Sequence, residues 1–291
     1  MIKLAHMLLL STKGCQDYEL LDSGNGKRLE RFGEYIISKP DPQAIWKQSL
    51  PYDRWKSADA KFENGKWEKR NGFPDKWQIS YKNVNFYAKL TSFKHTGVFP
   101  EQSLNWDFIQ QKINDQKSIN NIQPHVLNLF AYTGAASLVA AASGAKVTHV
   151  DASKPSIAWA KENQKLSNLL EKPIRYILDD AIEFTAREIR RGNKYEAIIM
   201  DPPVYGHGPN GEVWDFNKSF PVLLDNCSKL LSNKPLFVIA NAYAVSYSAI
   251  MLKNLSEDYF PKGNLEYGEL ALEQKNSRLL STGVFSRVSY I

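Results

Sequence analysis

Hydrophobic positions between residues 126 and 240 fall into short apolar runs, separated by longer stretches that mix apolar and polar residues. The runs do not alternate with polar residues, which is typical of strands that are buried on both faces. Five strands are predicted in this way, at residues 126–130, 147–150, 175–178, 197–200 and 236–240. The stretches between them predict helices at residues 134–143, 155–169, 180–191 and 220–231. This alternation predicts an α/β fold with a doubly wound, mostly parallel, Rossmann-like sheet.

The first hundred residues have a different pattern. Short alternating segments predict strands at residues 33–37, 77–81 and 84–90, with tight turns at residues 22–26 and 64–65. No long helical pattern interrupts them, so we expect a small β-rich region. Its tryptophans are interpreted as core residues rather than as a platform for stacking nucleic-acid bases. They are Trp46, Trp55, Trp67 and Trp77.

The two patterns predict two domains, a β-rich one over residues 1–100 and a larger one over residues 101–291. A helix is expected at residues 107–120, near the start of the larger domain. Residues 265–290 should supply the last, antiparallel strands of a seven-stranded sheet. The first ten residues are interpreted as a first strand or a frayed terminus.

Composition narrows the class of protein. The chain has 291 residues, of which 43% are hydrophobic and 23% are charged, as in ordinary soluble domains. Two cysteines and five widely spaced histidines predict neither a disulfide scaffold nor a metal site. No apolar run reaches membrane-spanning length and no cleavable leader is evident, so we expect a cytoplasmic protein without a membrane partner. The net charge of +6 is compatible with a polyanionic partner.

Three successive predicted strands end on carboxylates. These are Asp151, the pair Asp179-Asp180, and Asp201. Because ligands of parallel sheets bind beyond the carboxyl ends of the strands, we expect these side chains around one crevice. Asp201 is followed by two prolines and Val204-Tyr205-Gly206, so the chain leaves the sheet in a stiff turn rich in hydrogen-bond acceptors.

The first turn of the predicted sheet, residues 130–134, has the sequence Phe-Ala-Tyr-Thr-Gly. It lacks the glycines that bring a backbone against a pyrophosphate, which disfavours a dinucleotide-dependent dehydrogenase. Carboxylates and the aromatic faces of Phe130 and Tyr132 would instead attract a cation. Asp151 is placed to accept from a ribose diol, and Asp179 or Asp180 from an adenine amine. Cation, ribose and adenine together describe S-adenosylmethionine.

Three motifs carry a resemblance to a known family: residues 94–102 (Lys-His-Thr-Gly-Val-Phe-Pro-Glu-Gln), residues 130–134, and Asp201-Pro202-Pro203. Residues 126–241 resemble the catalytic domain of class I S-adenosylmethionine-dependent methyltransferases. From about residue 17 onward the chain is similar to the large-subunit ribosomal RNA methyltransferase branch. The N-terminal PUA module of some relatives has no counterpart in the sequence.

The resemblance implies S-adenosylmethionine as cofactor, S-adenosylhomocysteine as product, and a set of cofactor-binding residues. Phe130, Tyr132 and Gly134 would shape the methionine side of the pocket. Asp151, with Ala152 and Ser153 beside it, would hold the ribose, and Asp180 would contact the adenine. Residues 99–102 would fold over the cofactor. In chain order the set is Phe99, Gln102, Phe130, Tyr132, Gly134, Asp151, Ala152, Ser153, Asp180 and Asp201.

The resemblance also implies an acceptor side. Asp201, Pro202 and Pro203 would face the acceptor base as catalytic residues, with Tyr205 beside it. Trp214 could flank the acceptor too, because residues 206–211 are interpreted as a mobile lid.

Simpler interpretations stay open for several of these residues. Asp180 is a good N-cap for any helix. Ser153 is the candidate N-cap of the helix that follows Asp151, and Asp151 could also cap that helix. Asp201-Pro202-Pro203 could be only a rigid turn, and Trp214 only an anchor for its loop. Phe130 and Tyr132 could be core residues. The basic residues within 187–194 are interpreted first as a solvated face and second as an RNA contact.

Relatives that methylate carbon 5 of cytosine use a cysteine nucleophile after the fifth strand. Residues 238–243 contain none, and neither Cys15 nor Cys227 is an evident substitute. Attack by a nitrogen lone pair needs only positioning and exclusion of water. We therefore predict a nitrogen acceptor on guanine or adenine of RNA, with ribosomal RNA as the expected substrate. The alternatives are a protein or small-molecule acceptor, or a non-catalytic RNA-binding scaffold. The sequence does not predict the oligomeric state.

Overall fold

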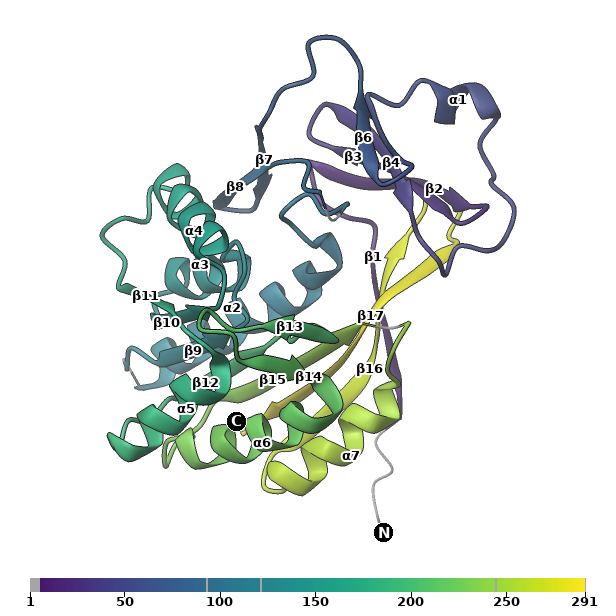
Figure 1. Ribbon diagram of the computed structural model, residues 1–291. Helices are drawn as coiled ribbons and strands as arrows, with labels where there is room; N and C mark the ends of the chain where they lie inside the picture. The colour runs from purple at the N-terminus through teal and green to yellow at the C-terminus, as the bar shows by residue number, and fades with distance from the viewer. Residues whose placement is uncertain (1–5, 93, 121, 244, 291) are drawn as a thin grey trace. The chain divides into compact units, whose positions relative to one another are not determined.

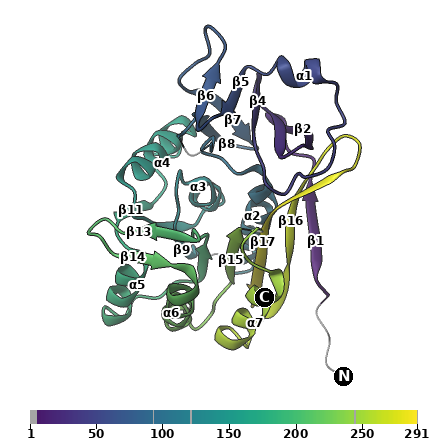
Figure 2. The ribbon, with the colours of Figure 1, turned by 45° about the vertical axis from the view of Figure 1, so that its right-hand side comes forward.

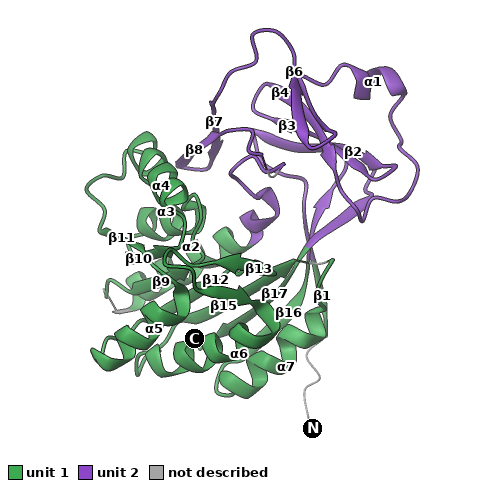
Figure 3. Ribbon diagram, viewed as in Figure 1, with its two compact units in different colours: residues 1–9, 105–269, 283–291 green, residues 10–104, 270–282 purple. Residues whose placement is uncertain are grey.

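The computed structural model describes residues 6–92, 94–120, 122–243 and 245–290. The chain forms two compact units, coloured separately in Figure 3. We call the first the sheet unit; it contains residues 105–269 and short segments from both ends of the chain. The second, the β-rich unit, contains residues 10–104 and 270–282. The expected division into two domains at residue 100 stays a prediction.

Eight strands form the main sheet within the described residues, in the order β1-β16-β17-β15-β12-β9-β10-β11 (Figure 1). The strand β9 (His125–Leu129), in the middle of the five parallel strands, has a parallel neighbour on each side. The predicted doubly wound α/β fold is thus confirmed, and β9 marks the place where the strand order reverses. Its parallel strands are β10 (Lys146–Asp151), β11 (Ile174–Leu178), β12 (Ala197–Met200) and β15 (Phe237–Tyr243).

The remaining strands are β17 (Leu279–Ser289), antiparallel to β15, then β16 (Asn264–Glu273) and, at the edge, β1 (Leu8–Thr12). The expected count of seven strands is therefore wrong, because β1 joins the sheet; residues 1–5 lie outside the described residues. Gly268 permits this close approach, since a Cβ atom there would lie 1.8 Å from the carbonyl oxygen of Leu8.

Helices cover both faces of the sheet, and alternate strand residues point to different helices. Ala197 and Ile199 of β12 pack in one cluster with α2 (Ser103–Asn120) and α3 (Ala135–Ala142). Ile198 and Met200 pack in a second cluster on the opposite face. The helices of that face, α5 (Ala181–Arg190), α6 (Phe216–Leu230) and α7 (Ala249–Tyr259), lie side by side in Figures 1 and 2.

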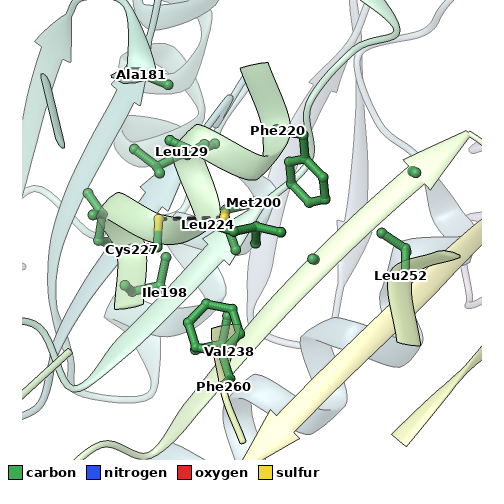
Figure 4. Packing of buried hydrophobic residues seen from close by; sticks show 14 of the residues in the cluster. Leu129, Ala181, Ile198, Met200, Phe220, Leu224, Cys227, Val238, Leu252 and Phe260 are labelled. Atoms are coloured by element: carbon green, nitrogen blue, oxygen red, sulfur yellow. Dashed lines mark hydrogen bonds between the residues drawn. The ribbon is translucent and has the colours of Figure 1, made fainter. Parts of the chain in front are cut away.

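Cys227 lies inside the second cluster (Figure 4). Its Sγ is 3.6 Å from the Sδ of Met200, the side chain is fully buried, and burial raises the pKa of the thiol well above its ordinary value. A thiol held protonated in a hydrocarbon core is a poor nucleophile. Cys227 is therefore a packing residue.

The predicted helices are confirmed with shifted ends. The one expected at residues 107–120 begins at Ser103, directly after a turn of 3₁₀ helix, η1 (Pro100–Gln102). The helix α6 begins four residues earlier than residue 220, because the carboxylate of Asp215 caps it by accepting from the N–H of Asn217 at 3.1 Å. The helix at residues 155–169 is α4 (Lys154–Leu166). No helix was predicted at the residues of α7.

The β-rich unit contains a five-stranded sheet and a separate hairpin. The hairpin of β7 (Trp77–Tyr81) and β8 (Val84–Ala88) confirms two predicted strands, although β8 ends two residues earlier than expected. The turns at Asn25-Gly26 and Asn64-Gly65 are present, but residues 22–24 of the first predicted turn belong to a strand, and the strand expected at residues 33–37 begins at Tyr35. The other strands are β2 (Tyr18–Gly24), β3 (Lys27–Phe32), β4 (Tyr35–Pro40), β5 (Ala60–Glu63) and β6 (Lys66–Lys69), with one short helix, α1 (Tyr52–Lys56).

The four tryptophans of this unit are structural. Trp55 and Trp77 are buried, and Trp46 and Trp67 are half-buried. Each indole N–H donates a hydrogen bond inside the unit: Trp46 to the carbonyl of Ser23, Trp55 to the carboxylate of Asp22, Trp67 to the carbonyl of Thr91 and Trp77 to the carbonyl of Phe32. Their donors are satisfied within the protein, as buried indoles require.

Candidate active site at the carboxyl edge of the sheet

The strand register brings the predicted site residues to one edge. Leu129 of β9 pairs with Val150 of β10 and with Met200 of β12. The next residue of each strand is therefore Phe130, Asp151 or Asp201, and the three leave the sheet side by side. This is the edge at which open parallel sheets bind ligands.

The loop after β9 has an unusual backbone. Phe130, Tyr132 and Gly134 all have positive φ, at 54°, 48° and 88°. Left-handed conformations are costly for residues with a Cβ atom, and they persist where the surrounding structure enforces them, often at ligand sites. Two hydrogen bonds hold the loop: Ala131 N–H to the Val150 carbonyl at 3.1 Å, and Gly134 N–H to the Ala131 carbonyl at 2.9 Å.

Asp151 ties this loop to the end of β10. Its Oδ2 accepts from the N–H of Tyr132 at 2.7 Å, and its Oδ1 accepts from the N–H of Ser153 at 2.8 Å. Burial raises the pKa of Asp151, and these two N–H groups act in the opposite direction. The helix cap is Ser153, which accepts from Ser156, so the interpretation of Asp151 as that cap is wrong. Each carboxylate oxygen keeps a lone pair for a ligand.

Gly134 fits closely under α4. A Cβ atom at this position would lie 3.0 Å from the Cβ of Ala160 and 3.6 Å from Cε1 of His149. No side chain could be added there without moving the helix, and the positive φ adds strain. The predicted importance of Gly134 therefore has a local structural cause.

Three buried polar residues beneath this loop form a hydrogen-bonded group that the sequence analysis did not predict. Asn128 donates to the hydroxyl of Ser137 at 2.9 Å, and that hydroxyl lies 3.0 Å from Nδ1 of His149. All three side chains are buried, and burial lowers the pKa of His149 to about 3. A neutral imidazole therefore supports β9 and β10 from below. Only the presence of polar residues inside apolar strands could have suggested it.

Asp180 is the N-cap of α5, as its simpler interpretation expected. Its Oδ1 accepts from the N–H groups of Ile182 at 2.8 Å and Glu183 at 3.1 Å. The cap uses Oδ1 alone, so contact of Asp180 with an adenine stays a prediction. Asp179, the alternative, forms an ion pair with Arg187, which is accordingly more than a solvated basic residue.

Residues 204–215 form a hairpin where the sequence suggested a mobile lid. Its strands are β13 (Tyr205–His207) and β14 (Val213–Asp215), paired through Gly206 and Trp214. Trp214 is buried, its Nε1–H donates to the carbonyl of Pro203 at 2.6 Å, and its ring centroid lies 4.7 Å from that of Phe130. Trp214 therefore anchors its loop instead of flanking an acceptor, and it fixes the turn that follows Asp201.

The opposite face of the hairpin is open. Tyr205 has 59% of its surface exposed and Val213 the same fraction. The Tyr205 ring packs edge-on against His207, with centroids 5.3 Å apart. Asp201 and Pro203 are exposed and Pro202 is buried between them. The turn thus presents a carboxylate and an aromatic side chain to solvent.

The other predicted cofactor residues divide between the units. Ala152 and Ser153 lie half-buried at the start of α4. Phe99 and Gln102 belong to the β-rich unit, where the N–H of Gln102 donates to the carbonyl of Phe99 at 3.0 Å and the ring of Phe99 lies 5.2 Å from that of His95. Their predicted position over the cofactor stays a prediction.

Within the described residues, no helix is long and apolar enough to cross a membrane.

Comparison with known proteins gives a family for this fold. A family model described as S-adenosylmethionine-dependent methyltransferase matches residues 53–250, more than half of the chain. The crystal structure of the SAM-dependent methyltransferase from Agrobacterium tumefaciens is 40% identical to this chain. It covers 98% of this chain and 94% of its own, with a TM-score of 0.93. A structure from Streptococcus mutans, 20% identical with a TM-score of 0.70, shares the fold alone; that likeness covers 94% of this chain and 75% of that one.

Curated relatives match a shorter part of the chain. The protein named ribosomal RNA large subunit methyltransferase K/L of Pseudoalteromonas atlantica is 34% identical over 156 residues, 53% of this chain and 20% of that protein. Its namesake from Shewanella oneidensis is 36% identical over 161 residues, 54% of this chain and 21% of that protein. The chain thus matches about a fifth of the length of these relatives.

Proposed function

Because the chain belongs to the S-adenosylmethionine-dependent methyltransferase family and uses that methyl donor, we propose that it methylates a base nitrogen of ribosomal RNA. The observation that carries the proposal is the convergence of Phe130, Asp151 and Asp201 at one sheet edge, next to a proline turn. The names of its curated relatives support RNA as the acceptor.

The residues of the carboxyl edge fit the cofactor chemically. When bound, S-adenosylmethionine supplies an electrophilic methyl group on a sulfonium cation. The remaining lone pairs of Asp151 suit a ribose diol, because two backbone N–H groups already fix the carboxylate. The strained loop from Phe130 to Gly134 would border the methionine part, and its aromatic rings favour a cation. Asp180 would accept from the adenine through the oxygen that its cap leaves unused.

The turn at Asp201 would hold the acceptor. An amino group on a base donates N–H, so the carboxylate of Asp201 and the carbonyls of the two prolines are suitable acceptors. These oxygens would accept hydrogen bonds from the amino group and so point its nitrogen lone pair at the methyl group. Correct positioning is the main requirement for attack by a nitrogen. The exposed ring of Tyr205 offers a surface on which the base could stack.

The arrangement of cysteines supports nitrogen over carbon 5 of cytosine. A covalent mechanism needs a thiolate at the acceptor. Cys227 is sealed in the core, and Cys15 belongs to the β-rich unit, where burial raises the pKa of its thiol. Both cysteines are free, which also supports the cytoplasmic location expected from the sequence.

Binding and methyl transfer would be tested separately. Calorimetry with S-adenosylmethionine and S-adenosylhomocysteine should show binding that Asp151→Asn weakens, while Asp258→Asn, an exposed aspartate of α7, leaves it unchanged. Transfer of a labelled methyl group to ribosomal RNA, followed by nucleoside analysis, should give a nitrogen-methylated purine.

Each part of the proposal can fail separately. Cofactor binding without any methylation of RNA would point to a protein or small-molecule acceptor. Label recovered as 5-methylcytosine would contradict the nitrogen assignment. Equal cofactor affinity in Asp151→Asn and the wild type would remove Asp151 from the site.

A further inference from the structure

A pocket of about 720 Å³ opens at the edge of the sheet unit opposite to the candidate active site. Its walls come from residues 231–235 before β15, residues 259–262 before β16, Tyr290 after β17, and Gln116 of α2. These segments adjoin the amino end of β15, since Phe237 pairs with Ser289. Asp151 and Asp201 lie at the carboxyl ends of strands parallel to β15, so the pocket is separate from them.

The charge of this pocket is opposite to that of the carboxyl edge. No aspartate or glutamate lines it, whereas two lysines do, Lys234 and Lys262. Both are exposed, and neither forms an ion pair with any residue that the structure describes. Lys229 and Lys253, on nearby helices, are by contrast paired with Asp225 and Glu257. Two unpaired ammonium groups beside an acid-free pocket favour an anion.

The inner wall favours a ligand with a planar body. Phe260 is buried, and Tyr259 and Tyr290 are half-buried, so each tyrosine presents part of its ring. Rings of this kind stack on planar ligands and contribute about 1–3 kcal/mol for a nucleic-acid base. A phosphate ion alone would leave this surface unused.

Gln116 gives a second and independent indication of a ligand. The residue is 5% exposed and lines the pocket, and its Oε1 is buried without a hydrogen-bond partner in the part of the chain that the structure describes. A buried amide oxygen without a partner costs about 1–3 kcal/mol, so such groups are rare. Rotation about the last side-chain bond is soft and would turn the amide towards a ligand that donates N–H.

We propose that this pocket binds a nucleotide, with its phosphate between Lys234 and Lys262, its base against Tyr259 and Tyr290, and an N–H group of the base donating to Oε1 of Gln116. The nucleotide is either free or part of an RNA chain, and both present the same chemistry. Binding here does not depend on the proposed acceptor, because the pocket lies away from the residues that would carry methyl transfer.

Binding would be measured on the full chain saturated with S-adenosylhomocysteine, which keeps adenine compounds out of the cofactor site. The probes are adenosine, guanosine and uridine monophosphates, inorganic phosphate, and a five-nucleotide single-stranded RNA, each titrated by calorimetry. Amide chemical shifts of residues 231–235 would locate the bound probe in the unaltered protein.

The double variant Lys234→Ala/Lys262→Ala should weaken nucleotide binding at least about tenfold, as expected for loss of charge-assisted hydrogen bonds to phosphate. The charge-matched control Lys165→Ala/Lys172→Ala removes two exposed lysines outside the pocket and should bind as the wild type does. Gln116→Leu should weaken the binding of nucleotides but not the binding of inorganic phosphate. Affinity for S-adenosylhomocysteine should stay unchanged in all of them.

The outcomes separate the two sources. If the monophosphates bind with the same affinity as the RNA, the ligand is a free nucleotide. If only the RNA binds, and this binding is lost in the double variant, the ligand is an RNA segment. The proposal is overturned if no probe shifts the amides of residues 231–235, or if the double variant and its control bind equally. Loss of methyl transfer with intact nucleotide binding would count against the proposed function only.

Discussion

The candidate site depends on a few residues whose backbone and side chain act together. Asp151 accepts from the loop after β9 and from the start of α4, so a single carboxylate joins two strand ends. Trp214 does the same for the proline turn, which has no N–H groups at its two prolines and is held through the Pro203 carbonyl. Both side chains therefore shape the site before any ligand arrives, which reduces the ordering that binding requires.

We expect Gly134→Ala to destabilise the protein more than Gly192→Ala does. Both glycines have positive φ, which costs about 1–2 kcal/mol for a residue with a Cβ atom. A Cβ atom at residue 192 would meet nothing within 4 Å, whereas at residue 134 it would lie 3.0 Å from Ala160. Urea denaturation of both variants gives the difference. Equal losses would show that α4 yields without cost.

Trp214→Phe should lower kcat about threefold to tenfold while cofactor affinity stays the same, because phenylalanine keeps an aromatic ring at this position but cannot donate a hydrogen bond to the Pro203 carbonyl. Steady-state kinetics beside calorimetry would separate these effects. Trp159→Phe, in α4, is the control for changing a tryptophan near the site without touching the proline turn. A fall in cofactor affinity with unchanged kcat would contradict a positioning role for Trp214.

Among the helices, α5 shows how one residue can serve the fold and the site. Its cap uses the carboxylate of Asp180, which lies directly after the end of β11. The helix start is thereby fixed at the edge where ligands bind, and the helix dipole favours negative charge at this position. The capping role and a ligand contact of Asp180 can be tested separately. A serine hydroxyl at this position can still cap the helix, but it lacks the negative charge of the carboxylate.

Asp180→Ala should reduce the unfolding free energy by about 1 kcal/mol, the usual value of an N-cap. Asp180→Ser keeps a capping oxygen and should restore most of that stability. If Asp180 also accepts from the adenine, the serine variant should still bind S-adenosylmethionine less tightly than the wild type. Thermal denaturation and calorimetry on both variants test this, and wild-type affinity in Asp180→Ser would leave only the cap.

Local sequence patterns predicted those elements whose signal lies within a few residues. The bounds of β12 and β7 match the predictions, because an apolar run and an alternating run end at prolines or at a turn. The helix α7 was missed although Ser248 caps it by accepting from Met251, a signal that the sequence does contain. The hairpin of β13 and β14 could not be predicted, since its glycine-rich residues fold through burial of Trp214 against distant partners.

The site shows the same limit. Strand order and the three terminal carboxylates predicted where a ligand would bind, and the register confirms that Phe130, Asp151 and Asp201 adjoin. The division of labour among them depends on hydrogen bonds that no spacing reveals. The ion pair of Asp179 with Arg187 and the contact of His149 with Ser137 are of this kind, whereas the cap at Ser153 was predicted and is confirmed.

The histidines make the stability of the molecule depend on pH. Burial lowers the pKa of His149 to about 3 and those of His125 and His95 to about 4, from an ordinary value of 6.5. The unfolded chain therefore binds protons that the folded chain does not. Stability is fully present above about pH 6.5 and is lost as the pH falls towards 4, at up to about 1.4 kcal/mol per pH unit for each histidine.

Replacing His149 by glutamine should make this dependence shallower. Urea denaturation of His149→Gln and of the wild type at pH 7.5, 6.0 and 5.0 would show it, with the gap between the two proteins narrowing as the pH falls. His207→Gln, which replaces an exposed histidine, is the matched control for the substitution itself. Parallel losses in His149→Gln and the wild type would mean that His149 does not titrate on unfolding.

The edge strand β1 has a protective role that follows from Gly268. The backbone of Leu8 lies so close to this glycine that no other residue fits, and the contact covers one margin of the ten-residue strand β16. Uncovered margins of long strands recruit further strands, often from other molecules. Deleting residues 1–12, or placing a bulky side chain at residue 268, should therefore yield protein that self-associates through β16, and light scattering would detect those assemblies before any loss of helix content.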